Sequence, residues 1–432
     1  MTEHSLASSG QNAWWQQSGA LRRFAADLLA AELASMRPGG PAVHPPGGWQ
    51  DDLLLGEEGL GADSLERLRM AAALAEALGT EAGDDGDRLL DLDSFGQWRD
   101  ICRRRLSADA QTIGFRSSGS TGTAKTCRHD LAGLEQEASV FAALLPGRRR
   151  VLTAVPAHHI YGFLFTILLP RALSDIPVLD LRPHSPAALA GLWRSGDLIV
   201  GHPDYWREAA RAPSPAPPDI VGVTSTAACP AEVAIAVAAA GLRLVEVFGA
   251  TETAGLGWRD DPDAGFRLLP HWRWDGGDII TRTLPGGTAA SAVLPDRLED
   301  LGKGLFHPLG RRDAMVQVGG VNVSPAAIAA TLRRHPLVAD AAVRLMRPEE
   351  GTRLKAFVVP KAEAPPPSEL AFMLMKWTEG ELPPPCRPRS FSFGPSLPVT
   401  LLGKASDWPV VAVDNLTVRQ PDLSITPQLG GA

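Results

Sequence analysis

The sequence predicts an α/β fold with a largely parallel sheet, together with a helical N-terminal region and a small α+β domain at the C-terminal end. Short apolar strands alternate with helices between residues 151 and 248, which is the pattern of a parallel sheet covered by helices. Apolar side chains recur at helical spacing between residues 20 and 36. A length of 432 residues with an apolar fraction of 44% allows two or three domains, each with its own core.

The composition argues against several classes of protein. The net charge is −7 and there is no long basic run, unlike in proteins that bind nucleic acid by neutralising its phosphates. No apolar run reaches the roughly 18 residues that span a bilayer, and the N-terminus lacks a signal-peptide pattern. The four cysteines are far apart without a C-x-x-C pair, which favours a reduced, cytoplasmic protein without structural zinc.

The first third of the chain is predicted to be helical after a tail over residues 1–20, which Trp14 and Trp15 would dock. The first helix ends at Arg37-Pro-Gly-Gly-Pro, because proline and glycine break a helix. A second helix opens at Asp63-Ser64-Leu65, where the aspartate is an ordinary N-cap. A further helix is expected over residues 95–106.

A loop rich in glycine and hydroxyl groups follows a predicted strand over residues 112–115 and precedes a predicted helix over residues 131–145. Its glycines let backbone N–H groups turn toward an anion, and its lysine adds a mobile positive charge. The sequence therefore predicts a cradle for a polyphosphate, formed by Ser117, Ser118, Gly119, Ser120, Thr121, Gly122, Thr123 and Lys125.

Two phosphate-binding families fit this loop. Residues 119–126 nearly match the Walker pattern G-x-x-x-x-G-K-[ST], with Ala124 in place of the second glycine, which would make the protein a P-loop phosphotransferase. Residues 117–125 instead resemble the loop of adenylate-forming enzymes, the superfamily of acyl-CoA synthetases and adenylation domains. The Walker interpretation also requires a second strand that ends in an aspartate for Mg²⁺, and the sequence offers no convincing one.

The stretch Phe248-Gly249-Ala-Thr251-Glu252 follows a predicted strand and carries a hard oxygen donor of the kind that Mg²⁺ prefers. It resembles the Tyr-Gly-x-Thr-Glu motif of adenylate-forming enzymes. The resemblance implies that Phe248 stacks near adenine, that Thr251 contacts phosphate and that Glu252 holds Mg²⁺. A small-residue turn upstream resembles the one that lines the family's adenine pocket, and it contains Ser225, Thr226 and Ala227.

Two further stretches resemble motifs of the same family. Pro156-Ala-His-His159-Ile-Tyr-Gly162 is similar to a segment of aryl- and acyl-CoA ligases such as 4-coumarate–CoA ligase, whose histidine borders the carboxylate substrate. Asp296 precedes Arg311 by fifteen positions, and Gly310-Arg311-Arg-Asp313 resembles the family's hinge. The resemblance implies that Asp296 and Arg311 bind the ribose, as a carboxylate and a guanidinium can, and that the C-terminal domain rotates about Asp313.

The C-terminal part is predicted to be a small α+β unit, with helices over residues 325–334 and 369–377 and strands over 341–345 and 354–359. Near its end, Leu397-Pro-Val-Thr-Leu-Leu-Gly-Lys404 resembles the family's Pro-x-Thr-x-x-Gly-Lys motif. The resemblance implies that Lys404 stabilises the charge that develops during adenylation.

Residues 21–106 resemble an acyl carrier protein, which implies a phosphopantetheine arm on Ser64. Only about 115 residues precede the phosphate loop, so the resemblance implies an adenylate-forming fold with a shortened large subdomain. The expected boundaries are a tail (1–20), a helical carrier-like region (21–107), an AMP-binding subdomain (108–311), a small mobile lid domain (312–407) and a loose tail (408–432).

These resemblances imply an acid–thiol ligase that uses ATP and Mg²⁺ to activate an aryl or acyl carboxylic acid as an acyl-adenylate. The acceptor would be CoA or the phosphopantetheine of an acyl carrier protein, including the chain's own. No nucleic acid and no membrane span are expected. A degenerate, non-catalytic AMP-binding scaffold is the alternative, because the N-terminal part is short and several motif positions are altered. The catalytic residues implied are His159, Thr251, Glu252 and Lys404.

Overall fold

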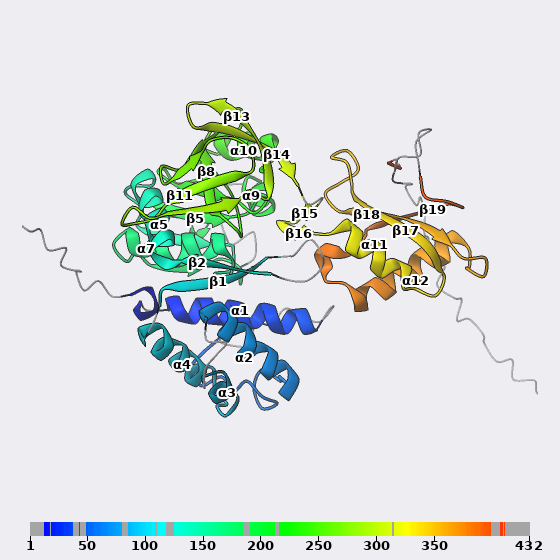
Figure 1. The fold of residues 1–432 in the computed structure, drawn as a ribbon, viewed down its shortest axis with the longest axis horizontal. Helices are drawn as coiled ribbons and strands as arrows, with labels where there is room; N and C mark the ends of the chain where they lie inside the picture. The colour runs from blue at the N-terminus through cyan, green and yellow to red at the C-terminus, as the bar shows by residue number, and fades with distance from the viewer. Residues whose placement is uncertain are drawn as a thin grey trace, which may run out of the picture.

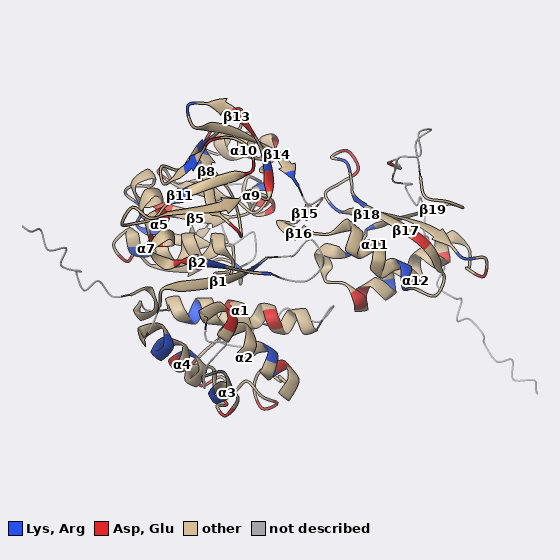
Figure 2. Ribbon diagram, viewed as in Figure 1, with Lys and Arg blue, Asp and Glu red and all other residues tan. Residues whose placement is uncertain are grey.

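The computed structural model describes residues 13–17, 19–37, 43, 49–79, 85–108, 110–117, 125–184, 191–211, 216–312, 315–398, 407, 408 and 410. A larger part built on a nine-stranded sheet is joined to a smaller C-terminal part (Figure 1). In the described part of the chain, no helix is long and apolar enough to cross a membrane. Figure 2 shows acidic and basic residues interspersed along the elements in this view, in keeping with the small net charge.

Strands pair in the nine-stranded sheet in the order β13-β14-β9-β8-β7-β6-β5-β3-β4. The five strands from β4 to β7 are parallel, as predicted, and β5 and β6 are buried along their whole length. The antiparallel strands β8, β9, β13 and β14 were not predicted. The bounds are β3 Arg150–Thr153, β4 Val178–Asp180, β5 Asp197–Gly201, β6 Val221–Thr224, β7 Arg243–Ala250, β8 Ala254–Arg259, β9 Phe266–Leu268, β13 Asp296–Gly302 and β14 Leu305–Arg311.

Helices accompany this sheet, and a small second sheet packs beside it. One helical stretch is continuous through α6, a π-helical turn (η2) and α7, and most of it is buried because most of its residues are apolar. The three-stranded sheet β10-β11-β12 was not predicted. The bounds are α5 Leu131–Leu144, α6 Ile160–Phe163, η2 Leu164–Leu168, α7 Leu169–Ala172, α9 Pro203–Ala209, α10 Ala231–Ala239, β10 Trp272–Trp274, β11 Ile279–Thr283 and β12 Ala289–Val293.

The N-terminal region is helical, as predicted, but it is not a separately packed unit. Trp14 is fully buried against the rings of Phe24 and Phe163, with centroids 5.8 and 5.1 Å apart. A single hydrophobic core runs from Trp14 to Phe306. The predicted tail therefore ends before Trp14, because this side chain needs the main domain to leave water. The elements are η1 Trp14–Gln16, α1 Ala20–Met36, α2 Ser64–Leu78, α3 Asp85–Leu90 and α4 Phe95–Ala108.

A two-stranded hairpin lies between these helices and the main sheet (Figure 1). Its strands are β1 (Thr112–Ser117) and β2 (Lys125–Asp130), and they pair antiparallel over their whole length. The predicted phosphate loop runs from Ser117 to Lys125, and its residues 118–124, which connect the two strands, lie outside the described residues. The second strand of this hairpin was not predicted. It leads directly into α5, whose first turn is capped by Asp130.

The C-terminal part is the small α+β unit that was predicted. A three-stranded sheet, β17-β18-β19, and two helices enclose a core of their own that includes Leu332, Leu354 and Leu370. The hairpin β15–β16 connects this unit to the larger part. The bounds are β15 Val316–Val318, β16 Val321–Val323, α11 Pro325–Arg333, β17 Val338–Leu345, β18 Leu354–Pro360, α12 Pro367–Glu381, η3 Pro384–Cys386 and β19 Ser390–Phe393.

Candidate active site

A cavity of about 200 Å³ lies where the carboxyl ends of the central parallel strands meet the hairpin β15–β16. Parallel sheets collect ligand sites at this edge. The cavity brings together residues from three of the predicted motifs and adds residues from the β15–β16 hairpin. The lining includes Arg116, His159, Tyr161, Leu164, Phe165, Ser225, Thr226, Val247, Gly249, Thr251, Gln317, Gly320 and Asn322.

His159 stands at the N-terminal end of α6 and presents its imidazole to the cavity. The residue is open to solvent through the cavity, while the protein atoms around its ring desolvate the charged form and lower the pKa of His159 to about 4. The neighbouring His158 ring lies 4.0 Å away between centroids. Burial, His159 and Arg182 together hold the pKa of His158 well below its usual value. Both imidazoles are therefore neutral near pH 7, and His159 can donate one hydrogen bond without forming an ion pair.

The turn after β6 places Ser225 and Thr226 on the cavity wall. The Ser225 hydroxyl donates to the carbonyl of Val247 at 2.8 Å, which fixes the turn against β7. Thr226 has a φ of 77°, which is a rare conformation for a β-branched residue. Its buried hydroxyl has no hydrogen-bond partner among the described residues. A strained backbone and an unpaired hydroxyl in one cavity wall are features of a ligand site.

The β15–β16 hairpin closes the cavity opposite Thr226. A Cβ on Gly320 would lie 2.5 Å from the Thr226 hydroxyl, and Gly320 also has a φ of 78°, so only glycine fits there. Asn322 lines the same wall, and its buried Oδ1 is unpaired within the described ranges. Gln317 and Asn322 were not predicted as site residues, although they follow the hinge motif at residues 310–313 closely in the sequence.

Buried contacts hold the Thr251–Glu252 turn after β7. The Nε2 of His129, on β2, lies 2.7 Å from the carbonyl oxygen of Thr251, so this nitrogen carries the proton. Glu137 of α5 accepts a hydrogen bond from the Gly255 amide at 2.8 Å. Burial lowers the pKa of His129, which keeps the ring neutral. The phosphate-loop hairpin is thus tied to the Thr-Glu turn through His129, a contact that the sequence does not reveal.

Glu252 is half-buried next to Thr251, and its charge acts on His129. Within the described part of the chain, no three metal-ligating side chains gather into a cluster. A single carboxylate nevertheless fits Mg²⁺, because this ion is commonly held by one or two carboxylates together with substrate phosphates and water. The carboxylate of Glu252 suits that donor set.

The other predicted nucleotide residues do not line this cavity. The Phe248 ring packs against Phe266 and Phe306, with centroids 5.5 and 5.6 Å away, so its stacking on adenine stays a prediction. Asp296 and Arg311 pair with each other at the end of β13 and β14, while Ala227 is half-buried beside Thr226. Ser117 and Lys125 pair at the base of the phosphate loop. Ser118 to Thr123, Asp313 and Lys404 lie outside the described residues.

Ser64 is exposed at the first position of α2. The side chain of Asp63 accepts a hydrogen bond from the Glu66 amide at 2.8 Å, and that of Glu66 accepts one from the Asp63 amide at 3.0 Å. This capping box accounts for the residues around Ser64 without a modification. The phosphopantetheine arm therefore stays a prediction from resemblance.

A large α/β part, a small α+β part and a cavity where the two meet define the class of adenylate-forming enzymes. The amide bond synthetase McbA from Marinactinospora thermotolerans has the same fold, with a TM-score of 0.58 and 18% identity over 90% of this chain and 93% of that one. The o-succinylbenzoate CoA synthetase from Bacillus subtilis gives a TM-score of 0.56 and 16% identity over 89% and 91%. Residues 327–404 match the AMP-binding enzyme C-terminal domain.

Relatives that align with this chain over nearly their whole length show to which group within this class the chain belongs. The chain is 37% identical to a 4-coumarate–CoA ligase from Halorhodospira halophila over 88% of its length and 97% of the relative's. It is 37% identical to one from Cereibacter sphaeroides over 90% and 96%. The chain therefore belongs to the adenylate-forming family of acid–CoA ligases. Because these alignments cover most of both partners, the relatives are about as long as this chain.

Proposed function

We propose that this enzyme activates an aryl carboxylic acid of the 4-coumarate type with ATP and transfers the acyl group to CoA. The observation that carries the proposal is the single cavity that joins His159, Thr226, Thr251 and the β15–β16 hairpin. The names of the near-full-length relatives support both the acid and the acceptor.

The reaction has two displacement steps. A carboxylate oxygen of the acid attacks the α-phosphorus of ATP, the bond to the β-phosphate bridge breaks, and pyrophosphate leaves. The sulfur of CoA, after losing its proton, then attacks the carbonyl carbon of the acyl-adenylate, and AMP leaves with the carboxylate oxygen. The main obstacle to the first step is the repulsion between two anions.

The chain supplies groups that would lower this repulsion. The hydroxyls and amides of the phosphate loop, together with Thr251, would bind the phosphates, and Lys404 would stabilise the charge at the α-phosphate. Mg²⁺ held by Glu252 would supply further positive charge when bound. Neutral His159 would hydrogen-bond the acid carboxylate without trapping it in an ion pair. Asp296 and Arg311 would hold the ribose.

The apolar wall of the cavity favours an uncharged aryl group. Tyr161, Leu164, Phe165 and Val247 form this wall. The Tyr161 hydroxyl lies 3.0 Å from the carbonyl oxygens of Gly201 and Val223, so its polar end is satisfied by the protein and its ring is fixed. Among the described lining residues no carboxylate is present to pair with the α-ammonium group of an amino acid.

The P-loop alternative conflicts with the observed fold. A Walker loop leads from a strand into a helix, whose N-terminus binds the phosphates. Here the chain leaves the loop into β2 and reaches α5 only at Leu131. A phosphotransferase of the P-loop class is therefore the wrong interpretation of residues 119–126.

CoA is the acceptor that we propose, in place of a phosphopantetheine arm on Ser64. The capping box explains the sequence around Ser64, and the surrounding helices share the core of the main domain.

The test of this function is pyrophosphate release from ATP and Mg²⁺ with a panel of acids, followed by mass spectrometry of the CoA products. We expect release with 4-coumarate and related aryl acids, formation of the aryl-CoA, and much weaker release with amino acids. Pyrophosphate release that does not depend on the acid would favour the degenerate scaffold. ATP binding without turnover of any acid would favour it as well.

A further inference from the structure

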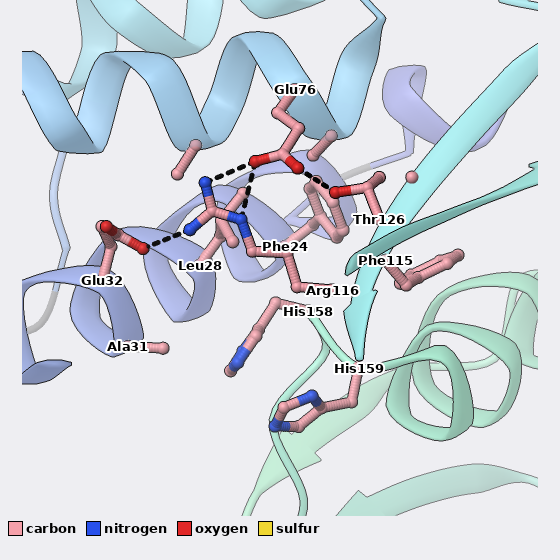
Figure 3. Close-up of a pocket in the computed structure, with 13 residues that line it drawn as sticks. Phe24, Leu28, Ala31, Glu32, Glu76, Phe115, Arg116, Thr126, His158 and His159 are labelled. Atoms are coloured by element: carbon pink, nitrogen blue, oxygen red, sulfur yellow. Dashed lines mark hydrogen bonds and ion pairs between the residues drawn. The ribbon is translucent and has the colours of Figure 1, made fainter. Parts of the chain in front are cut away.

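Two helices of the N-terminal region bind one arginine of the phosphate-loop hairpin through their glutamates (Figure 3). Arg116, the penultimate residue of β1, donates from Nη1 to Glu32 of α1 at 2.6 Å and from Nε to Glu76 of α2 at 2.7 Å. Arg116 Nη2 also donates to Glu76. The guanidinium is thus held by two carboxylates from two different helices, which is a geometrically specific and comparatively strong arrangement.

The same glutamate binds the opposite strand. The hydroxyl of Thr126, on β2, donates to the second carboxylate oxygen of Glu76. Arg116 and Thr126 are Cα partners in the hairpin, and the next pair, Ser117 and Lys125, carries the two ends of the loop. Glu76 therefore joins both strands one residue pair from the point where the predicted phosphate loop leaves and returns.

The hairpin also packs closely on the end of α2. A Cβ on Gly114 would lie 2.8 Å from Thr126 and 3.1 Å from the carbonyl oxygen of Glu76. The side chain of Arg128 donates to that same carbonyl at 2.8 Å. The last turn of α2 is thereby attached to the hairpin through the side chain and the backbone of Glu76.

The network lies on the wall of a second cavity, of about 180 Å³, with Phe24, Leu28 and Phe115 around it. Glu32 is only 8% exposed, so its attraction to Arg116 is screened less than a surface ion pair would be. Arg116 and His159 belong to the walls of both cavities. The network thus reaches from the N-terminal helices to the edge of the reaction cavity.

We propose that Glu76, with Glu32, Arg116 and Thr126, is a positioning device that holds the base of the ATP-binding loop in its productive geometry. The proposal rests on the proposed function, since it takes residues 118–124 to bind the phosphates of ATP. The N-terminal helices would thereby contribute to ATP binding. They fix the hairpin whose loop would bind the anion. Holding a binding group in place lowers the free-energy cost of ordering it when ATP arrives.

The test compares Glu76→Gln with Glu66→Gln on the same helix. Glu66 forms a similar ion pair, with Arg37 at 2.6 Å, but it caps the far end of α2 and does not touch the hairpin. We expect Glu76→Gln to raise KM for ATP about tenfold, with kcat and KM for the acid within about twofold of wild type. Glu66→Gln should leave all three constants unchanged. Both variants should lose thermal stability to a similar, small extent.

A double-mutant cycle tests whether the residues act together. The double variant Glu76→Gln/Arg116→Gln should raise KM for ATP no more than the larger of the two single substitutions does. The reason is that each substitution alone already removes the ion pair between Glu76 and Arg116. Thr126→Val removes one arm of the network with little change in shape. It should raise KM for ATP by a smaller factor than Glu76→Gln does. It provides the test of the proposal if the glutamate variants fold poorly.

Two results would overturn the proposal. One is a lowered melting temperature with unchanged KM for ATP, and the other is an equal rise in KM for ATP and for the acid. Equilibrium binding of ATP separates this failure from failure of the proposed function. If wild type binds ATP but releases no pyrophosphate, the proposed function fails, and weaker ATP binding by Glu76→Gln still supports the positioning role.

Discussion

Asp296 and Arg311 lie directly opposite each other in the antiparallel pair β13–β14, at the edge of the nine-stranded sheet. A separation of fifteen positions in the sequence is therefore converted by one hairpin into a neighbouring carboxylate and guanidinium. This is the chemistry that two ribose hydroxyls and a phosphate oxygen require.

Replacing Asp296 with alanine tests this assignment. We expect KM for ATP to rise about tenfold or more, because hydrogen bonds to a charged acceptor are lost, while KM for the acid stays near that of wild type. Glu299→Ala, an exposed position on the same strand, is the matched control. Equal effects of the two changes would remove Asp296 from the ribose site.

We expect Lys404 to be needed for formation of the acyl-adenylate and not for transfer of the acyl group to CoA. Lys404→Ala should abolish acid-dependent pyrophosphate release, because the charge at the α-phosphate loses its cation, and ATP binding should persist. The variant should still convert supplied acyl-adenylate and CoA into the thioester. Lys361→Ala, an exposed lysine of the same part, should behave as wild type. Normal pyrophosphate release by Lys404→Ala would refute its role.

His159 makes the stability of the enzyme depend on pH in a defined window. Its folded pKa of about 4 lies below the ordinary value of 6.5. Between these values the unfolded chain binds a proton that the folded protein does not, so stability is lost as pH falls through this range and is complete above it.

The measurement is the urea midpoint at about pH 5 and about pH 7.5. We expect His159→Asn to reduce the loss of stability on acidification, and His184→Asn, which lies outside the cavity lining, to leave it unchanged. An identical acid response in wild type and His159→Asn would mean that the folded imidazole titrates normally.

Gly320 tests the contact between the β15–β16 hairpin and the cavity. Gly320→Ala should slow aryl-CoA formation at least tenfold, because its Cβ would meet Thr226 at 2.5 Å and displace the hairpin. Gly319→Ala is the control, since Gly319 also has a positive φ, of 57°, but a Cβ there meets nothing within 4 Å. Thr226→Ala should partly rescue Gly320→Ala, and its failure to do so would contradict the packing argument.

Ser64 should not be required for turnover. Intact mass after incubation with CoA and a phosphopantetheinyl transferase should be unchanged, and Ser64→Ala should form aryl-CoA at the wild-type rate. A mass gain that Ser64→Ala abolishes, together with loss of product, would establish a carrier arm instead.

Much of the fold follows from local patterns in the sequence. The helix over residues 20–36 was predicted with its observed ends, because a proline- and glycine-rich segment stops it at once. The parallel strands from β3 to β7 were found because they are short apolar runs. The antiparallel strands β12 and β13 were missed because most of their residues are exposed and leave no such run.

The same contrast holds for the site: residues in short local motifs were predicted, and residues whose role depends on contacts between distant parts of the chain were not. His159, Thr226 and Thr251 were predicted because each lies in a recognisable short motif, and the structure places all three on one cavity. His129 and Glu76 were not predicted, since their importance comes from contacts with residues far away in the chain. Asn322 was not predicted either, since its place on the cavity wall depends on the fold. The burial of Trp14 was missed for that reason, because it depends on Phe163.

The measurement that tests the central claim most directly follows the carboxylate oxygen of the acid. The acid is labelled with heavy oxygen in its carboxylate, and AMP is analysed by mass spectrometry after turnover with ATP, Mg²⁺ and CoA. An acyl-adenylate route transfers one labelled oxygen to AMP, which is the result we predict. Unlabelled AMP, or ADP with the label in inorganic phosphate, would contradict the account.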